Sequence, residues 1–263
     1  MSSVRSAVLV GGALLLGGSA FAQWSSDPAV NTLVSAPSLG YAFTQKACSD
    51  GKGGTIVAWY DDRNGTDDIY AQHFNKLGLK LWGENGIPIC VMDGSQDYVR
   101  IASDGEGGAV IAWQDGRAAG TGIYVQRVNA SGTSLWTDNG VWAVDDNNCA
   151  SVDSDGKGGA VVLGYDGVIN RISAGGVVLW GAPNSAIEFC SSPSYAKLAG
   201  DGKGGAFVVY QDSELYMQHF SANGATDWVC QLATSGSCPR LTSDGDSGVF
   251  VMWYDGSEIR AQY

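Results

Sequence analysis

The sequence has 263 residues, an apolar content of 44% and a formal net charge of −12. An acidic chain of this kind disfavours binding to nucleic acid and to anionic membranes. Glycine is frequent, at 38 residues, whereas proline is rare, at 6, and this combination predicts many tight turns and not disorder.

Residues 1–22 have the pattern of a secretory signal peptide. Arg5 provides a positive start, residues 7–18 are small and apolar, and Ala20-Phe21-Ala22 is a small-x-small cleavage site. Cleavage after Ala22 removes Arg5 and leaves a secreted chain that begins at Gln23, with no further segment apolar enough to cross a membrane as a helix. A retained N-terminal anchor is the alternative.

Six cysteines lie in the exported part of the chain: Cys48, Cys90, Cys149, Cys190, Cys230 and Cys238. An even number of cysteines in an oxidising compartment favours disulfides, with 15 possible pairings. The alternative is that they are free, buried thiols. There is no CxxC pair, so we expect no zinc site.

A glycine-rich turn, first seen at residues 49–54, occurs five times. Its aspartates are Asp50, Asp104, Asp155, Asp201 and Asp244, at spacings of 54, 51, 46 and 43 residues. A glycine follows each aspartate, and a second glycine closes each turn. Glycine permits a positive φ and aspartate bonds its own backbone, so each copy predicts a hairpin turn. The period is typical of the blades of a β-propeller.

Each turn is followed by strand-like segments in constant positions. A short apolar run such as 109–112 predicts a buried strand, and an aspartate follows it in every copy: Asp61, Asp115, Asp166, Asp212 and Asp255. A half-exposed strand is predicted next, over 68–74, 122–128, 168–172 and 214–220. A tryptophan then stands ten residues beyond the glutamine or asparagine of that strand: Trp82, Trp136, Trp180 and Trp228.

The fifth copy stops after its third strand, at 258–263, whereas residues 23–34 resemble an outer strand that has no blade before it. Pairing the two would leave no open edge. We therefore expect an all-β protein: a five-bladed β-propeller in which the N-terminal strand completes the last blade. Residues 23–263 would form this single domain, with blades near 37–90, 91–144, 145–190, 191–231 and 232–263 plus 23–36. The rival hypothesis is a fragment, or a ring completed by a second chain.

The blade pattern is Asp-Gly-x-Gly-Gly, four apolar residues, Trp-x-Asp, Ile-Tyr-x-Gln and Leu-Trp. It resembles the repeat of secreted bacterial β-propeller proteins, most clearly over 49–90 and 103–144. The resemblance implies a propeller fold and a periplasmic or extracellular location in a bacterium, and it carries over no catalytic residues. Sialidases are also propellers, but their Asp-box does not match this turn. Fold analogy alone does not assign a function.

Several residues are candidates for chemistry. His73 and His219 share one position of the repeat, which favours a structural role over catalysis. The five repeated aspartates after the buried strand favour a role in capping turns.

Arg63 and Arg117 would form bidentate pairs with acidic neighbours or bind a carboxylate ligand. The hairpin at 61–68 would be either a solvated acidic turn or a Ca²⁺ site. The predicted metal ligands in this hairpin are Asp61, Asp62, Asp67 and Asp68.

The loops on one face of the propeller carry acidic and aromatic residues, including Trp142, Asp145 and Asp146. Trp142 lies outside the repeated tryptophan positions, and it is the best candidate for stacking on a sugar. The sequence favours a secreted, non-enzymatic binding module that uses this face for a carbohydrate or protein ligand. The alternatives are a glycoside hydrolase with axial carboxylates and a structural component of a cell-surface assembly. We expect no cofactor other than Ca²⁺, and a monomer unless the ring is incomplete.

Overall fold

The computed structural model describes residues 24, 29, 31–35, 42–183, 187–190 and 194–263. Its regular elements are nineteen β-strands in five antiparallel sheets. The segment predicted as a signal peptide, residues 1–22, lies outside the described residues. Within them, no helix is long and apolar enough to span a bilayer.

Each sheet is built from consecutive strands of the chain. The first sheet contains β1 (Ala42–Ser49), β2 (Thr55–Asp61), β3 (Asp68–Phe74) and β4 (Ile87–Cys90). The second contains β5 (Gln96–Ser103), β6 (Ala109–Asp115), β7 (Gly122–Val128) and β8 (Val141–Val144). The third contains β9 (Cys149–Ser154), β10 (Ala160–Gly164), β11 (Val168–Ile172) and β12 (Ile187–Glu188). The fourth contains β13 (Ser194–Gly200), β14 (Ala206–Asp212), β15 (Glu214–Phe220) and β16 (Thr226–Ala233). The fifth contains β17 (Ser237–Ser243), β18 (Val249–Tyr254) and β19 (Ile259–Gln262).

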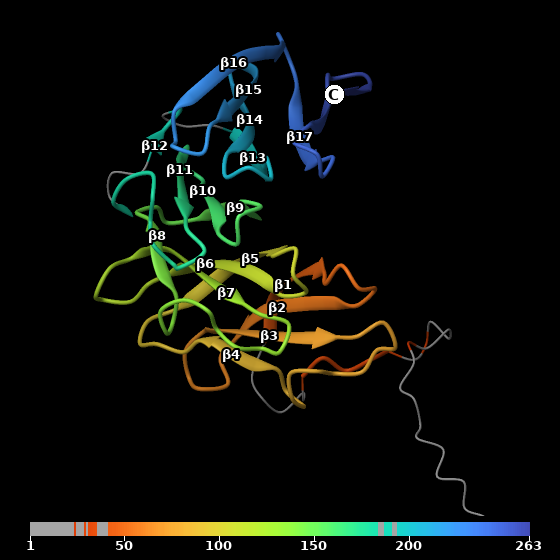
Figure 1. The fold of residues 1–263 in the computed structure, drawn as a ribbon, viewed down its shortest axis with the longest axis vertical. Helices are drawn as coiled ribbons and strands as arrows, with labels where there is room; N and C mark the ends of the chain where they lie inside the picture. The colour runs from red at the N-terminus through yellow and green to blue at the C-terminus, as the bar shows by residue number, and fades with distance from the viewer. Residues whose placement is uncertain (1–23, 25–28, 30, 36–41, 184–186, 191–193) are drawn as a thin grey trace, which may run out of the picture.

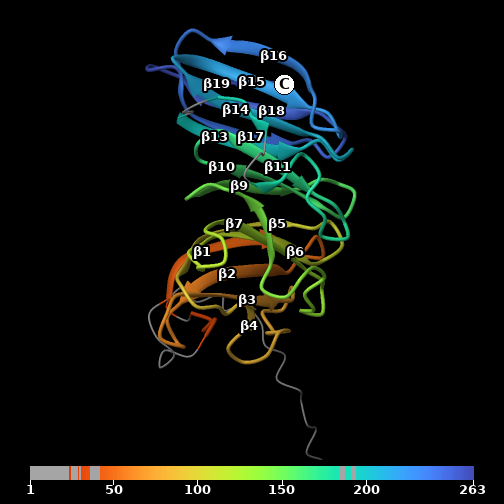
Figure 2. The same ribbon diagram turned by 90° about the vertical axis from the view of Figure 1, so that its left-hand side faces the viewer.

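The sheets follow one another as the blades of a β-propeller do. In Figure 1 the outer strands β4, β8, β12 and β16 lie along one side, and the inner strands β5, β9, β13 and β17 lie toward the other. In Figure 2 the first sheet, β1–β4, lies at the bottom, and the fourth and fifth sheets overlap at the top, with β16 uppermost. Contacts join the first strand of each sheet to the first strand of the next, from β1 to β17. The all-β repeat architecture predicted from the sequence is therefore confirmed.

The core is a series of apolar layers between successive sheets. The layer between the first two sheets contains Ile56, Ile69, Ile111 and Trp113, all fully buried. Three further layers join the second to the third sheet, the third to the fourth and the fourth to the fifth. In the second, third and fourth blades the second strand is buried on both faces, because each of its faces packs against a neighbouring blade. This explains the continuous apolar runs in the sequence.

The glycine-rich turns join the first and second strands of every sheet. In each turn, one carboxylate oxygen of the aspartate accepts the backbone N–H groups two and four residues later, at 2.7–2.9 Å. The glycine after the aspartate has a positive φ, for example 78° at Gly105. The closing glycine is needed for another reason: a Cβ on Gly108 would lie 2.1 Å from the Val128 carbonyl oxygen. It therefore allows close approach of the adjacent strand.

A hydrogen bond explains the constant ten-residue spacing between the third strand and the tryptophan. The side-chain oxygen of Gln72, Gln126 or Asn170 accepts the backbone N–H of Trp82, Trp136 or Trp180, each at 3.0 Å. In the fourth blade Gln218 instead donates to the Thr226 hydroxyl, at 2.8 Å. The tryptophans of the first three blades precede the fourth strand, whereas Trp228 lies within β16.

The fifth sheet has three strands, and no strand of the described chain pairs with the outer edge of β19. Of the segment expected to complete it, residues 24, 29 and 31–34 are described, and none of them is in a strand; residues 23, 25–28 and 30 lie outside the described residues. The Trp24 ring lies 5.4 Å from the Phe74 ring, and it would be 3.2 Å from a Cβ on Gly78. Trp24 therefore packs on the first blade.

The expected disulfides are absent: no bond joins any two of the six cysteines, all of which lie in the described part of the chain. Cys90 and Cys149 are buried in separate apolar layers, and Cys230 and Cys238 are exposed on strands of different sheets. Burial raises the pKa of the Cys149 thiol to about 12. Buried cysteines of this kind act as small core residues, which was the alternative that the sequence left open.

Candidate functional site

Arg63 and Arg117 lie in two equivalent clusters with an aspartate, a tryptophan and a tyrosine. In the second blade Asp115 accepts the Trp113 indole N–H and the Arg117 Nε–H, both at 2.8 Å. The Arg117 guanidinium lies 3.9 Å above the ring of Tyr124. Both Arg117 and Asp115 are buried. The Arg117 guanidinium is therefore held by partners within the protein, including Cys90 of the first blade at 3.2 Å, which favours a structural ion pair over a ligand contact.

The first blade repeats this arrangement. Asp61 accepts the Trp59 indole N–H and the Arg63 Nε–H, both at 2.7 Å, and the Arg63 guanidinium lies 3.7 Å above the ring of Tyr70. The ligand-binding role considered for Arg63 is not supported, because both of its strong interactions are internal. The structural ion pair is the interpretation that the geometry favours.

The histidines are also structural. His73 Nε2 lies 3.0 Å from Asp50, and His219 Nε2 lies 3.2 Å from Asp201. Their repeat position holds Arg127 and Arg171 in the second and third blades, which bind Asp104 and Asp155. In every blade, then, a side chain of the third strand binds the second carboxylate oxygen of the turn aspartate; in the fifth, Tyr263 does so, at 2.6 Å.

The structure separates the roles of Trp142, Asp145 and Asp146. Trp142 lies on β8, opposite Tyr124, and its half-buried ring contacts the β6–β7 hairpin at Gly120 and Gly122. Asp146 is buried and accepts the N–H groups of Asn148 and Asp166, so it caps the loop. A Cβ on Gly164 would meet its carboxylate, which explains why the third blade lacks the repeated tryptophan. Asp145 remains exposed.

The four carboxylates proposed as Ca²⁺ ligands have different surroundings in the structure. Asp61 is bound by Arg63 and Trp59, and Asp68 is buried and accepts the Asn64 amide at 3.0 Å. In the part of the chain that the structure describes, no three histidine, cysteine, aspartate or glutamate residues are grouped to hold a metal. Asp62 and Asp67 are therefore half-buried carboxylates of an acidic turn.

One face of the molecule, the loop face, is formed by the hairpins between second and third strands and by the links between blades. These segments contact each other: Gln96 N donates to Asp67 O and Gly116 N donates to Ser95 O, both at 2.8 Å, and Asp145 N donates to Pro183 O at 3.0 Å. The hairpin of one blade therefore lies against the link that leads to the next. The same face was predicted from the sequence.

Carboxylates crowd the loop face between the first and second blades. Burial, together with the negative charges of Asp67 and Asp115, raises the pKa of Asp97 to about 6. Burial and the charge of Asp62 likewise raise the pKa of Asp67. Among the described residues, one carboxylate oxygen each of Asp68 and Asp97 is buried without a hydrogen-bond partner. A positively charged group at this place would relieve both the repulsion and the missing bonds.

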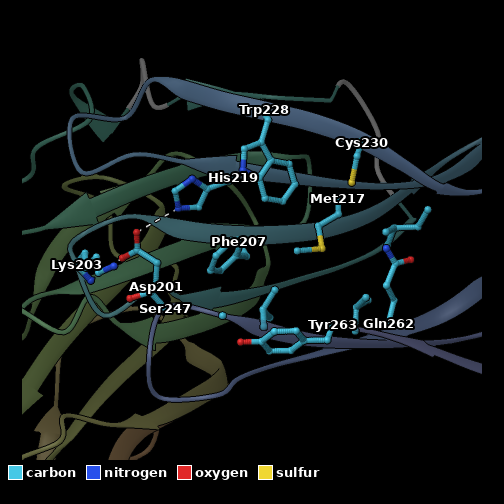
Figure 3. Close-up of a pocket in the computed structure, with 14 residues that line it drawn as sticks. Asp201, Lys203, Phe207, Met217, His219, Trp228, Cys230, Ser247, Gln262 and Tyr263 are labelled. Carbon is cyan, nitrogen blue, oxygen red and sulfur yellow. Dashed lines mark hydrogen bonds and ion pairs between the residues drawn. The ribbon is translucent and has the colours of Figure 1, made fainter.

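A cavity of about 500 Å³ opens between the fourth and fifth sheets. Figure 3 shows Phe207, Met217, His219, Trp228 and Tyr263 around it, with Asp201 at one end. Asp201 is the only described carboxylate in its lining, and it already accepts the N–H groups of Lys203 and Gly205 and contacts His219. The lining thus offers aromatic and apolar surface but no pair of free carboxylates.

The cavity occupies a place that is filled between the other blades. The indoles of Trp82, Trp136 and Trp180 donate to Ala130, Ala174 and Ala222 in the next blade, at 2.9–3.1 Å. No described residue covers Trp228 in this way, and its side chain is 40% exposed against 6% for Trp136. Sequence reasoning missed this cavity, although Asp227 in place of the usual leucine before Trp228 marked the difference.

No protein-family model and no curated protein matches the chain. Among solved structures, it is similar to a protein of unknown function from Dyadobacter fermentans, with 14% identity, a TM-score of 0.47, and coverage of 87% of this chain and 80% of that one. A protein of unknown function from Bacteroides caccae has 12% identity, a TM-score of 0.44, and coverage of 81% and 71%. An endo-arabinase from Bacteroides thetaiotaomicron has 15% identity, a TM-score of 0.39, and coverage of 79% and 89%. Similarity at this level assigns no activity.

Proposed function

We propose that the protein is a secreted, non-enzymatic binding module and that its contact surface is the acidic loop face. The observation that carries this proposal is the group of carboxylates at the first and second blades, where buried oxygens of Asp68 and Asp97 have no partner among the described residues. Such groups are retained at a cost in stability. The ligand would be a protein segment or a carbohydrate that presents a positive charge.

Three features support a binding role over glycoside hydrolysis. A glycosidase needs two carboxylates about 5–9.5 Å apart and free to react. The turn aspartates all accept backbone N–H groups, and Asp61, Asp115 and Asp255 are each held by an arginine. Among the described residues, the main cavity is lined by a single carboxylate, Asp201, which is bonded internally. Release of reducing sugar from polysaccharides would favour the hydrolase instead.

The proposal includes a five-bladed propeller in which the N-terminal strand is the fourth strand of the fifth blade. The position of Trp24 supports it. Trp82, Trp136 and Trp180 each lie against the glycine of a turn in the following blade, at Gly132, Gly176 and Gly224, and Trp24 lies in the same way against Gly78. Trp24 thus takes the place of the tryptophan of a blade that precedes the first. Completion by a second chain, as in a cell-surface assembly, is the alternative.

The loop face can be tested with immobilised poly-L-lysine as a cationic probe. We expect Asp97→Asn to weaken binding about 3- to 10-fold, since one exposed or half-buried charge pair contributes roughly 1 kcal/mol. Binding by the unmodified protein should also weaken as the pH falls through about 6, because Asp97 is then protonated. Surface plasmon resonance between pH 8 and pH 5 measures both effects.

Asp246→Asn is the matched control. Asp246 is exposed in the turn between β17 and β18, away from the loop face, and its replacement removes the same charge. It should leave binding within 2-fold of the unmodified protein. Equal weakening by the two variants would mean that the probe senses only net charge, and the loop-face proposal would then be wrong.

A further inference from the structure

Four positive side chains occupy one position of the repeat, on the inner strands. Four residues before each turn aspartate stand Lys46, Arg100, Ser151, Lys197 and Arg240. The chain has only 15 lysines and arginines against 27 acidic residues, so composition does not explain four cations at five equivalent places. We call Lys46, Arg100, Lys197 and Arg240 the inner-strand cations.

The strand ladders confirm that these positions are equivalent. Lys46 pairs with Ala58, Arg100 with Ala112, Lys197 with Val209 and Arg240 with Met252, each directly after a shift in register of the inner strand. Within each shift, the residue two positions before the cation has a positive φ: Thr44, Tyr98, Tyr195 and Cys238. Four non-glycine residues in this strained conformation mark a repeated bulge, and bulges re-aim the side chains next to them.

The inner-strand cations of different blades act on one another. Lys197 is half-buried; burial lowers the pKa of its amine, and the charges of Arg240 and Arg100 lower it further. Arg100 and Lys197 also both act on Cys149 of β9, which lies between their strands. The inner strands β5, β9, β13 and β17 contact one another in succession, so the cations of the second, fourth and fifth blades lie on one series of neighbouring strands.

Neighbouring carboxylates do not neutralise Lys197 and Arg240. The Lys197 amine donates to the Ala196 carbonyl, and the Arg240 guanidinium donates to the Pro239 carbonyl, both at 2.9 Å. Neither Lys197 nor Arg240 forms an ion pair with a described residue. The carboxylates of the inner strands are placed elsewhere: Asp97 is at the loop-face end of β5, and Asp153 accepts the Gly200 N–H at 3.0 Å.

We propose that the inner-strand cations form a binding site for an acidic polysaccharide. Four of the five blades present a positive charge at the same position of the repeat, which suits a polymer with one acidic group on each of several sugars. Guanidinium groups bind carboxylates and sulfates through paired N–H donors. Tyr98 and Tyr195 stand just before Arg100 and Lys197, with 46% and 50% of their side chains exposed. Exposed aromatic rings of this kind stack on the apolar faces of sugars. The charge of this site is opposite to that of the loop face.

The test is affinity electrophoresis in gels that contain polygalacturonate, with fully methyl-esterified polygalacturonate as the neutral control. Dextran sulfate and dextran form a second pair, which distinguishes sulfate from carboxylate as the preferred group. We expect the protein to bind an acidic polymer and not its neutral partner, and the affinity to fall with rising salt. Equal binding to the neutral polymers would overturn the site.

The variant Lys197→Gln/Arg240→Gln should bind the acidic polymer at least 10-fold more weakly. The matched control is Lys52→Gln/Lys157→Gln, which removes two exposed lysines from the glycine-rich turns and should change the affinity less than 2-fold. Arg240 is exposed, so Arg240→Gln alone serves if the double variant does not fold, with an expected loss of about 3-fold. Equal losses in the test and control pairs would contradict the proposal, as would stronger binding to oligo-dT than to either acidic polymer.

Discussion

At the scale of the residue, each repeated polar side chain satisfies a particular set of backbone groups. Gln126 is fully buried; its oxygen accepts the N–H groups of Arg127 and Trp136, both at 3.0 Å, and its amide donates to the Thr137 carbonyl at 2.9 Å. This one side chain therefore fixes the path from the third strand to the tryptophan. The repeat preserves the residue type because few other side chains can both donate and accept in this geometry.

Gln126→Leu should destabilise the protein by about 2–4 kcal/mol, because two backbone N–H groups and one carbonyl would be left buried without partners. The matched control is Gln218→Leu. Gln218 holds the same position in the fourth blade, but its amide bonds the Thr226 hydroxyl and not a tryptophan N–H, so we expect a loss of about 1 kcal/mol. Urea unfolding followed by tryptophan fluorescence compares the two. A larger loss for Gln218→Leu would contradict this account.

At the scale of the element, the glycines of the turn have two different functions. Gly105 provides a positive φ in open surroundings, because a Cβ added there would have no atom within 4 Å. Gly108 has no unusual φ, but it lies against the carbonyl of the third strand. The first glycine shapes the turn, and the second lets the third strand pass close to the turn.

Gly108→Ala should therefore be more harmful than Gly105→Ala. A Cβ at residue 108 would lie 2.1 Å from the Val128 oxygen and 2.9 Å from the Asn129 Cα, so the β6–β7 pair would have to move. We expect a loss of at least about 3 kcal/mol for Gly108→Ala, and about 1 kcal/mol for Gly105→Ala, where only the left-handed backbone is disfavoured. Thermal unfolding by circular dichroism measures both. Similar losses would mean that φ alone sets the requirement for glycine.

The repeat in the sequence was sufficient to predict most of these elements. The third strands over 68–74, 122–128, 168–172 and 214–220 were predicted with the bounds that the structure has, since turn signals are local. Their predicted half-exposure was wrong for β3 and β7, which are buried along their whole length, because their polar side chains bond within the blades. The inner-strand cations were missed because a bulge interrupts the alternation of their strands. The roles of Arg63 and Asp61 were left open for a different reason: a nearby pair in the sequence does not reveal whether its charges face each other or a ligand.

At the scale of the whole molecule, the two end blades have exposed surfaces. β16 and β19 are largely exposed, and so is β1 at the other end. Between these ends, every pair of successive sheets is joined by an apolar layer. An exposed edge strand favours pairing with another strand. We therefore expect the edge of β19 and the N-terminal segment to pair through backbone hydrogen bonds. The alternatives differ in whether the strand comes from the same molecule or from a second copy.

Deletion of residues 23–36 from the mature protein should remove the partner of β19. We expect the deletion to lower stability by about 2 kcal/mol or more, because it removes the packing of Trp24 on Phe74 together with a set of strand hydrogen bonds. Hydrogen exchange at 259–262 should then become fast, while exchange at the buried strand 109–115 should change only as far as global stability falls.

Trp24→Ala is the milder variant, with an expected loss of about 1–2 kcal/mol and preserved pairing at β19. Light scattering on the unmodified protein separates the two sources of the strand: a monomer with protected 259–262 supports closure within one chain, and a concentration-dependent dimer supports exchange between copies. Unchanged exchange at 259–262 after the deletion would show that the N-terminal segment does not complete the fifth blade.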